Sequence, residues 1–158
     1  MTKLKNIALV LALSQFFGFV AIAQTHFTFT SITGNNGTVG ILLNAPSIAG
    51  TPLVAGDEIG AFTPAGLCVG AVVWDGVSNV AVTVWEDDSQ TPAVDGIKAG
   101  EVIKYRIWRQ STNTEFSDPS VTYAVGNGTY ASGCVFQVSS LTVSAGPMYD
   151  TGYGKECT

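Results

Sequence analysis

The stretch of sequence that decides the fold is Glu101-Val-Ile-Lys-Tyr-Arg-Ile-Trp-Arg109. Ile103, Tyr105 and Ile107 alternate with a lysine and an arginine, so one face of the segment is apolar and the other is charged. Successive side chains of a β-strand point to opposite faces of the sheet. This period of two therefore predicts a strand that buries one face in a core.

Similar short segments recur along the chain and are separated by turn residues. Thr63-Pro-Ala-Gly66 predicts the turn of a hairpin, because proline and glycine supply turn geometry. Residues 45–55 contain two prolines and are predicted to form a loop. Further strands are predicted at residues 26–33, 38–43, 57–62, 67–74, 79–85, 121–125, 130–138 and 141–143. No helical apolar period follows residue 23, so the prediction is an all-β fold, a single antiparallel β-sandwich of Ig-like or jelly-roll type.

The first 23 residues have the pattern of a signal peptide. Lys3 and Lys5 precede an apolar stretch at residues 7–20, and Ala21-Ile-Ala23 is a cleavage pattern. The alternative is a membrane anchor, but the stretch is short for a span and ends in a cleavage motif. We therefore predict a signal peptide at 1–23, a sandwich domain at 24–144 and a flexible tail at 145–158. The predicted location is secreted, periplasmic or at the cell surface, with no membrane span after cleavage.

The charge balance of the predicted mature chain excludes nucleic-acid binding. Without the two lysines of the signal peptide, five basic residues remain against twelve acidic ones, a net charge of −7. Such a chain repels phosphate backbones. Only 12% of all residues are charged, which is unlike a disordered polyelectrolyte.

Three cysteines follow the signal peptide, and export to an oxidising compartment permits a disulfide. Cys68 and Cys134 both lie in predicted strands, so a Cys68–Cys134 bridge is the first prediction. The alternative is that both are small buried apolar residues. Cys157, near the end of the chain, could join two copies or fasten the tail. Self-association is predicted through Cys157 or through edge strands.

Catalytic chemistry finds little support in the sequence. His26 is the only histidine and follows the predicted cleavage point by three positions, where chain ends are often mobile. A nucleophile with a histidine base needs a buried, oriented imidazole. Asp57-Glu58 and Asp87-Asp88 are adjacent in sequence, so in a strand their side chains point to opposite faces. We predict that the protein is not an enzyme.

The segment Trp85-Glu-Asp-Asp-Ser-Gln-Thr-Pro-Ala-Val-Asp-Gly96 is an acidic loop between two predicted strands. Calcium prefers carboxylate and carbonyl oxygens and tolerates irregular loops. Asp87, Asp88 and Asp95 are the candidate ligands, with Glu86 as a fourth. The alternative is a solvated turn in which aspartate side chains accept hydrogen bonds from nearby backbone N–H groups. Both interpretations remain open at this point.

The three tryptophans allow two interpretations. Trp74, Trp85 and Trp108 end or interrupt strands rich in valine and isoleucine, as core tryptophans of sandwiches do. Exposed on one face, they would instead form a platform on which sugars stack. Their exposure to solvent separates a structural module from a carbohydrate-binding one.

Several runs of the sequence together resemble a family. They are Gly56-Asp-Glu-Ile-Gly-Ala-Phe62, Leu67-Cys-Val-Gly-Ala71, Val84-Trp-Glu-Asp-Asp88, Asp95-Gly96 and Ala99-Gly-Glu-Val-Ile-Lys-Tyr-Arg-Ile-Trp108. These runs are similar to β-sandwich modules in large surface proteins exported by bacteria with type IX secretion. The resemblance implies a non-catalytic structural or adhesive module of the cell envelope or surface, whose partner is a surface protein or a polysaccharide. The alternative function is that of a carbohydrate-binding module.

Overall fold

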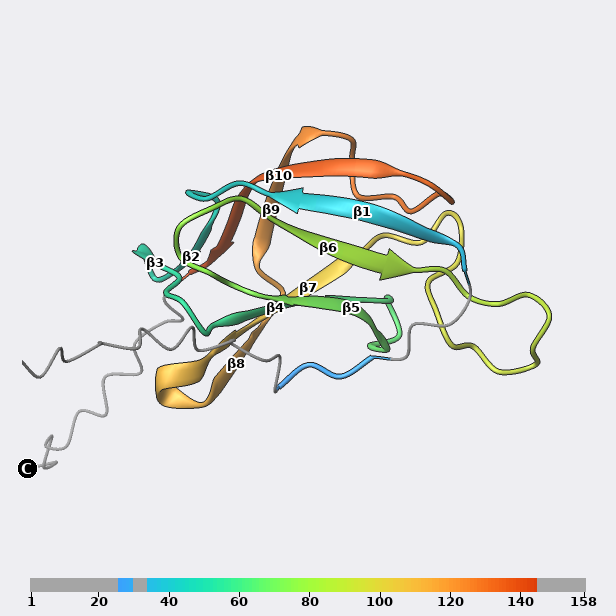
Figure 1. Cartoon of the computed structure of the whole chain (residues 1–158), viewed down its shortest axis with the longest axis horizontal. Helices are drawn as coiled ribbons and strands as arrows, with labels where there is room; N and C mark the ends of the chain where they lie inside the picture. The colour runs from blue at the N-terminus through green and yellow to red at the C-terminus, as the bar shows by residue number, and fades with distance from the viewer. Residues whose placement is uncertain (1–25, 30–33, 145–158) are drawn as a thin grey trace, which may run out of the picture.

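The computed structural model describes residues 26–29 and 34–144, so the predicted signal peptide and tail lie outside the described residues. Two β-sheets pack against each other (Figure 1). The six-stranded sheet contains β1 (Asn36–Ile41), β2 (Pro46–Ile48), β3 (Thr51–Pro52), β6 (Val80–Trp85), β9 (Ser120–Val125) and β10 (Val135–Val143). The four-stranded sheet contains β4 (Glu58–Phe62), β5 (Cys68–Val73), β7 (Lys104–Arg109) and β8 (Thr114–Ser117). A short 3-10 helix, η1 (Gln110–Thr112), joins β7 to β8. The predicted all-β sandwich is confirmed.

The six-stranded sheet is built around β10, the longest strand. β10 runs parallel to β1, with Thr38 opposite Val135, and also parallel to β2, with Pro46 opposite Leu141. It runs antiparallel to β9 along its other edge. These two parallel ladders differ from the prediction, which was an antiparallel sandwich. All other ladders between strands are antiparallel.

The four-stranded sheet has the order β5-β4-β7-β8, and all its ladders are antiparallel. The predicted hairpin between β4 and β5 is confirmed. The backbone N–H of Gly66 donates to the carbonyl of Thr63 over 2.9 Å, and Gly66 has a φ of +90° that favours glycine.

The main core lies between the two sheets and takes residues from both. The alternating residues of β7 behave as predicted: Tyr105 and Ile107 are buried in this core. The other fully or nearly buried members are Val39, Ile41, Ala45, Leu53, Ile59, Ala61, Val69, Trp74, Val82, Val84, Ile97, Ile103, Tyr130, Phe136, Val138 and Leu141. The sandwich therefore has one contiguous core.

The sandwich is tightly closed along the side where β5 meets β6. A Cβ atom at Gly70 of β5 would collide with the backbone carbonyl of Thr83 in β6, so only glycine permits this approach. On the other side, β8 ends at Ser117 and the chain crosses to the opposite sheet as β9. A cleft remains between β7 and β9 on that side.

Four sequence-based predictions need correction. The predicted strand at 26–33 is not formed at residues 26–29, which belong to no strand, and residues 30–33 lie outside the described residues. The predicted loop at 45–55 contains the short edge strands β2 and β3, where a proline occupies the first position of one and the last of the other. Residues 130–138 and 141–143 do not form two strands, because one strand, β10, spans 135–143. Strand β8 was not predicted, since its sequence Thr-Glu-Phe-Ser is short and mostly polar.

Candidate functional site

Residues 26–29, which we name the arm, cover the outer face of the four-stranded sheet. Figure 1 shows this segment in blue on the β4–β5 side of the molecule, away from β1. Alternation in β4 directs Ile59 and Ala61 into the main core and directs Glu58 and Phe62 to the outer face. Phe27, Phe62 and Trp108 form a second apolar cluster there. The arm therefore has a binding surface of its own outside the main core.

Glu58 anchors the backbone of the arm. The N–H of His26 lies 3.0 Å and 3.2 Å from the two carboxylate oxygens, and the N–H of Phe27 donates to Oε2 over 2.9 Å. Glu58 is only 1% exposed. A buried carboxylate is tolerated when hydrogen bonds satisfy it, and two consecutive N–H groups do so here.

The ring of His26 lies flat against Trp108. The ring centroids are 4.7 Å apart and the planes differ by 1°. The Nε2 atom of His26 lies 3.0 Å from Oε2 of Glu115, whose other oxygen accepts a hydrogen bond from Arg106 over 3.0 Å. Partial burial acts to raise the pKa of Glu115, but the hydrogen bonds from His26 and Arg106 outweigh it and hold this pKa below its ordinary value. The ionised carboxylate is therefore the favoured partner of the arm.

The ring of Phe27 packs over Gly60, in the space that a side chain at this position would fill. We name this space the seat. A Cβ atom at Gly60 would lie 3.0 Å from the ring of Phe27 and 2.7 Å from that of Phe62. The two rings meet edge to face at 5.4 Å, and the guanidinium of Arg106 lies 4.3 Å from the centre of the Phe62 ring. We name Glu58, Gly60, Phe62, Trp108 and Glu115 the arm site.

The acidic loop is folded by hydrogen bonds from its own backbone. Asp87 Oδ1 accepts from the N–H of Asp95 over 2.8 Å, and Asp95 Oδ1 accepts from the N–H of Asp88 over 3.0 Å. Asp88 Oδ1 accepts from the N–H of Gln90 over 2.9 Å. These three contacts have the form of the solvated turn that the sequence left open as the alternative to calcium.

The remaining contacts of the loop also tie it to the body of the protein. The hydroxyl of Tyr130 donates to Glu86 Oε2 over 3.3 Å, and Nζ of Lys98 lies 3.7 Å from Asp87 Oδ2. Within residues 26–29 and 34–144, no group of three or more His, Cys, Asp or Glu side chains converges closely enough to hold a metal ion. Each candidate ligand therefore already has a hydrogen-bonding or ionic partner within the protein, and calcium binding stays a prediction.

The predicted disulfide is wrong, because Cys68 and Cys134 are both free thiols. Cys68 packs against the second apolar cluster on the outer face of the four-stranded sheet, whereas Cys134 packs against the main core beside Gly37. Both were expected in strands, but side-chain direction decides whether two strands can be bridged. Burial raises the pKa of the Cys68 thiol, which disfavours the reactive thiolate. Cys157 lies outside the described residues.

The three tryptophans do not share an exposed face. Trp74 is 1% exposed within the main core, and Trp108 is 7% exposed beneath His26. Trp85 is half-buried at the end of β6. In the described part of the chain, the exposed large apolar side chains are valines and a leucine, and none is aromatic.

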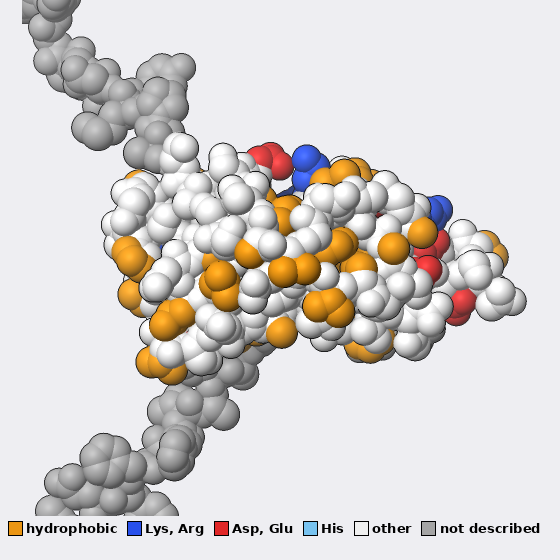
Figure 2. Space-filling view, turned by 90° about the horizontal axis from the view of Figure 1, so that it is seen from above, with side chains coloured by type: hydrophobic (Ala, Val, Ile, Leu, Met, Phe, Trp, Pro, Cys, Tyr) orange, Lys and Arg blue, Asp and Glu red, His pale blue; other side chains and the backbone are white. Residues whose placement is uncertain are grey.

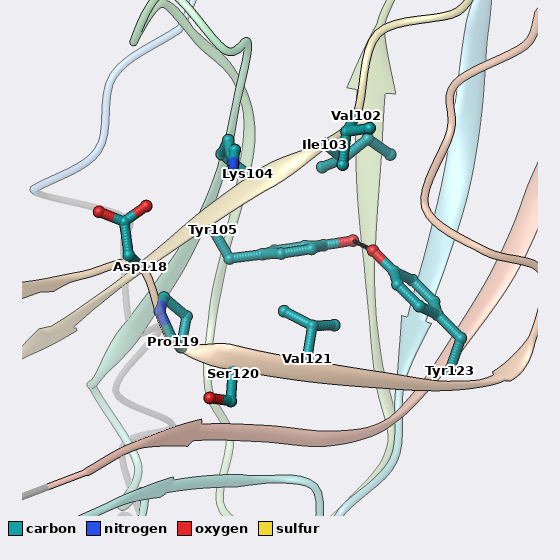
Figure 3. A pocket seen from close by; sticks show the side chains of 9 residues that line it. All are labelled: Val102, Ile103, Lys104, Tyr105, Asp118, Pro119, Ser120, Val121 and Tyr123. Carbon is teal, nitrogen blue, oxygen red and sulfur yellow. Dashed lines mark hydrogen bonds between the residues drawn. The ribbon is translucent and has the colours of Figure 1, made fainter.

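A cleft of about 370 Å³ lies between β7 and β9 (Figure 3). The hydroxyls of Tyr105 and Tyr123 meet across its inner end at 3.2 Å, and Val121 lies beneath them. Burial raises the pKa of both tyrosines, so they remain neutral donors and acceptors at physiological pH. Lys104 and Asp118 also line the cleft.

Comparisons of the chain with protein-family models, curated proteins and solved structures find no match. Of the helices within the described residues, none has the length and apolar character needed to cross a membrane.

Sequence reasoning missed the arm site, although two signals were present. Glu58 shares a predicted strand face with Gly60 and Phe62, and an acid on an apolar face requires a hydrogen-bonding partner. The arm itself has aromatic residues at alternate positions, Phe27 and Phe29. No local pattern in the sequence shows that a segment 32 positions away along the chain packs on that face.

Proposed function

We propose that the protein is a secreted, non-catalytic structural or adhesive β-sandwich module of the bacterial cell envelope or surface. Its partner in this proposal is a surface protein or a polysaccharide, bound by surface contact and not by a deep site.

One observation carries this proposal: the six-stranded sheet contains no charged residue in any of its strands. Its outward positions include Thr38, Ala81, Thr83 and Thr122, which alternate with the core residues of the same strands. Figure 2 looks onto this side, where Asp, Glu, Lys and Arg gather at the periphery and most of the surface is uncharged. A broad surface without charge can be dehydrated at low cost, as an interface requires.

The burial of Trp74 and Trp108 supports this function over the carbohydrate-binding alternative. Sugar stacking needs exposed and roughly coplanar aromatic rings, and the described residues present none.

The test combines location with attachment. An antibody against the protein is applied to intact cells and to fractions, and purified protein is then applied to cells that lack it. We expect surface labelling and rebinding. Rebinding should fall at least tenfold in a Thr83→Lys/Thr122→Lys variant and remain unchanged in a control with lysine at exposed Val77, outside the sheet. Retention in the cytoplasm, or equal rebinding by both variants, would contradict the proposal.

A further inference from the structure

We propose that the arm site is an acceptor for the amino-terminal arm of a second copy of this chain, so that copies associate by exchanging arms. The arm occupies the site in its own molecule in the structure. Every contact that holds it would be available, unchanged, to the identical arm of a neighbour. This exchange does not depend on the surface role proposed above.

The arm site recognises an extended peptide by specific chemistry. Glu58 receives two consecutive backbone N–H groups, Trp108 and Glu115 receive the imidazole of residue 26, and the seat over Gly60 receives the ring of residue 27. Backbone hydrogen bonds combined with separate seats for neighbouring side chains are the features of peptide-binding sites. The occupant that fits all of them is a segment with the sequence His-Phe, as the arm has.

The arm is separable from the fold. Phe27, Phe62 and Trp108 form a cluster distinct from the main core, and residues 26–29 belong to no strand. The sandwich therefore keeps its core when the arm leaves. An empty site would expose the aromatic rings and remove two hydrogen bonds from buried Glu58, which favours replacement of one arm by another over a vacant site.

The connection is long enough to reach a neighbour. Six residues, 30–35, lie between the arm and β1, and an extended chain of that length spans roughly 20–22 Å. Packed sheets lie only about 10 Å apart, so a released arm extends well beyond its own sandwich. The tethered arm competes with a millimolar effective concentration, so exchange between two unaltered copies is sparsely populated in dilute solution.

Complementation between two variants removes that competition. Phe27→Ser impairs the arm and leaves the site intact, whereas Gly60→Val fills the seat and leaves the arm intact. Each variant, produced from Gln24 onward and confirmed as folded by circular dichroism, should be monomeric by light scattering after size exclusion. We expect the mixture to yield a 1:1 complex of doubled mass. A mixture of two differently tagged Phe27→Ser copies is the matched control and should remain monomeric.

A peptide provides a second readout that does not require the Gly60→Val variant to fold. The peptide Gln24-Thr-His-Phe-Thr-Phe-Thr30 is titrated into the Phe27→Ser protein by calorimetry, with a Phe27→Ser peptide as control. We expect saturable binding that weakens at least tenfold for the control peptide. Absence of peptide binding would overturn the proposal. Peptide binding without a complex between two folded variants would also overturn it, since the arm would then act only within its own molecule.

Discussion

The two sheets of this sandwich present contrasting outer faces. The four-stranded sheet carries Glu58, Lys104, Arg106, Arg109 and Glu115, and aromatic rings cluster on its outer side beneath the arm. The six-stranded sheet has no charged residue in its strands, and its outer side combines small polar side chains with the exposed Val125 and Val135.

The difference shows how side-chain size decides whether a sheet face needs a cover. Aromatic rings that face bulk water destabilise the folded state, and so does a buried carboxylate without hydrogen-bond donors. The arm covers the rings and donates hydrogen bonds to the carboxylate. The other face exposes threonine, serine and alanine together with Val125 and Val135, and each of these side chains places less apolar area in water than an aromatic ring does. One face is thus suited to a specific peptide and the other to broad contact.

The largest expected effect comes from the same substitution on the two faces. Gly60→Val should destabilise the protein by about 3 kcal/mol, because its side chain overlaps the rings of Phe27 and Phe62. Gly40→Val lies in β1 of the other sheet, where a Cβ atom meets only a carbonyl of Phe136 at 3.6 Å, and should change stability by less than about 0.5 kcal/mol. Urea denaturation measures both. Equal losses would remove the contrast between the faces.

A smaller effect is expected for the buried carboxylate. Glu58→Gln should cost about 2 kcal/mol, because an amide cannot accept from both N–H groups of the arm with the strength of a carboxylate. Glu101→Gln is the matched control, since Glu101 is a half-buried acid that accepts one N–H, from Lys98, over 2.9 Å. It should cost about 0.5 kcal/mol or less. Unfolding curves in which Glu58→Gln is as stable as the control would contradict the role of Glu58.

The pH dependence of the arm contact follows from Glu115. Its folded pKa lies below the ordinary value of 4.5, so the unfolded state binds the proton more readily. The contribution of Glu115 is therefore complete above pH 4.5 and is lost as pH falls through the folded pKa. The difference in melting temperature between the unaltered protein and Glu115→Gln should be larger at pH 6 than at pH 3. A difference that grows on acidification would show that the sign is wrong.

Calcium should have the smallest effect. Asp87, Asp88 and Asp95 each already accept a backbone N–H, so an ion adds little to the folded loop. Millimolar calcium, compared with chelator, should raise the melting midpoint by less than the roughly 4 °C that corresponds to 1 kcal/mol in a domain of this size. A larger rise, absent from an Asp87→Asn/Asp95→Asn variant, would establish the loop as a calcium site.

The sequence predicted what depends on local periodicity. The alternation around Tyr105 located β7, and Thr63-Pro-Ala-Gly66 located the hairpin turn. It failed where non-local packing decides: Cys68 and Cys134 occupy different apolar clusters, and no local pattern records which way two distant side chains face. The same limit hid the arm site, because the bond between His26 and Glu58 joins residues that no spacing rule connects.

The backbone of the arm holds it to the four-stranded sheet, and amide hydrogen exchange measured by NMR reports on these hydrogen bonds one residue at a time. The N–H groups of His26 and Phe27 are donated to a buried carboxylate, whereas Thr28 is exposed. We expect the His26 and Phe27 amides to exchange at least a hundredfold more slowly than in the isolated peptide of residues 24–30, and Glu58→Gln to reduce this protection. Exchange of both amides at the rate of the free peptide in the unaltered protein would contradict it.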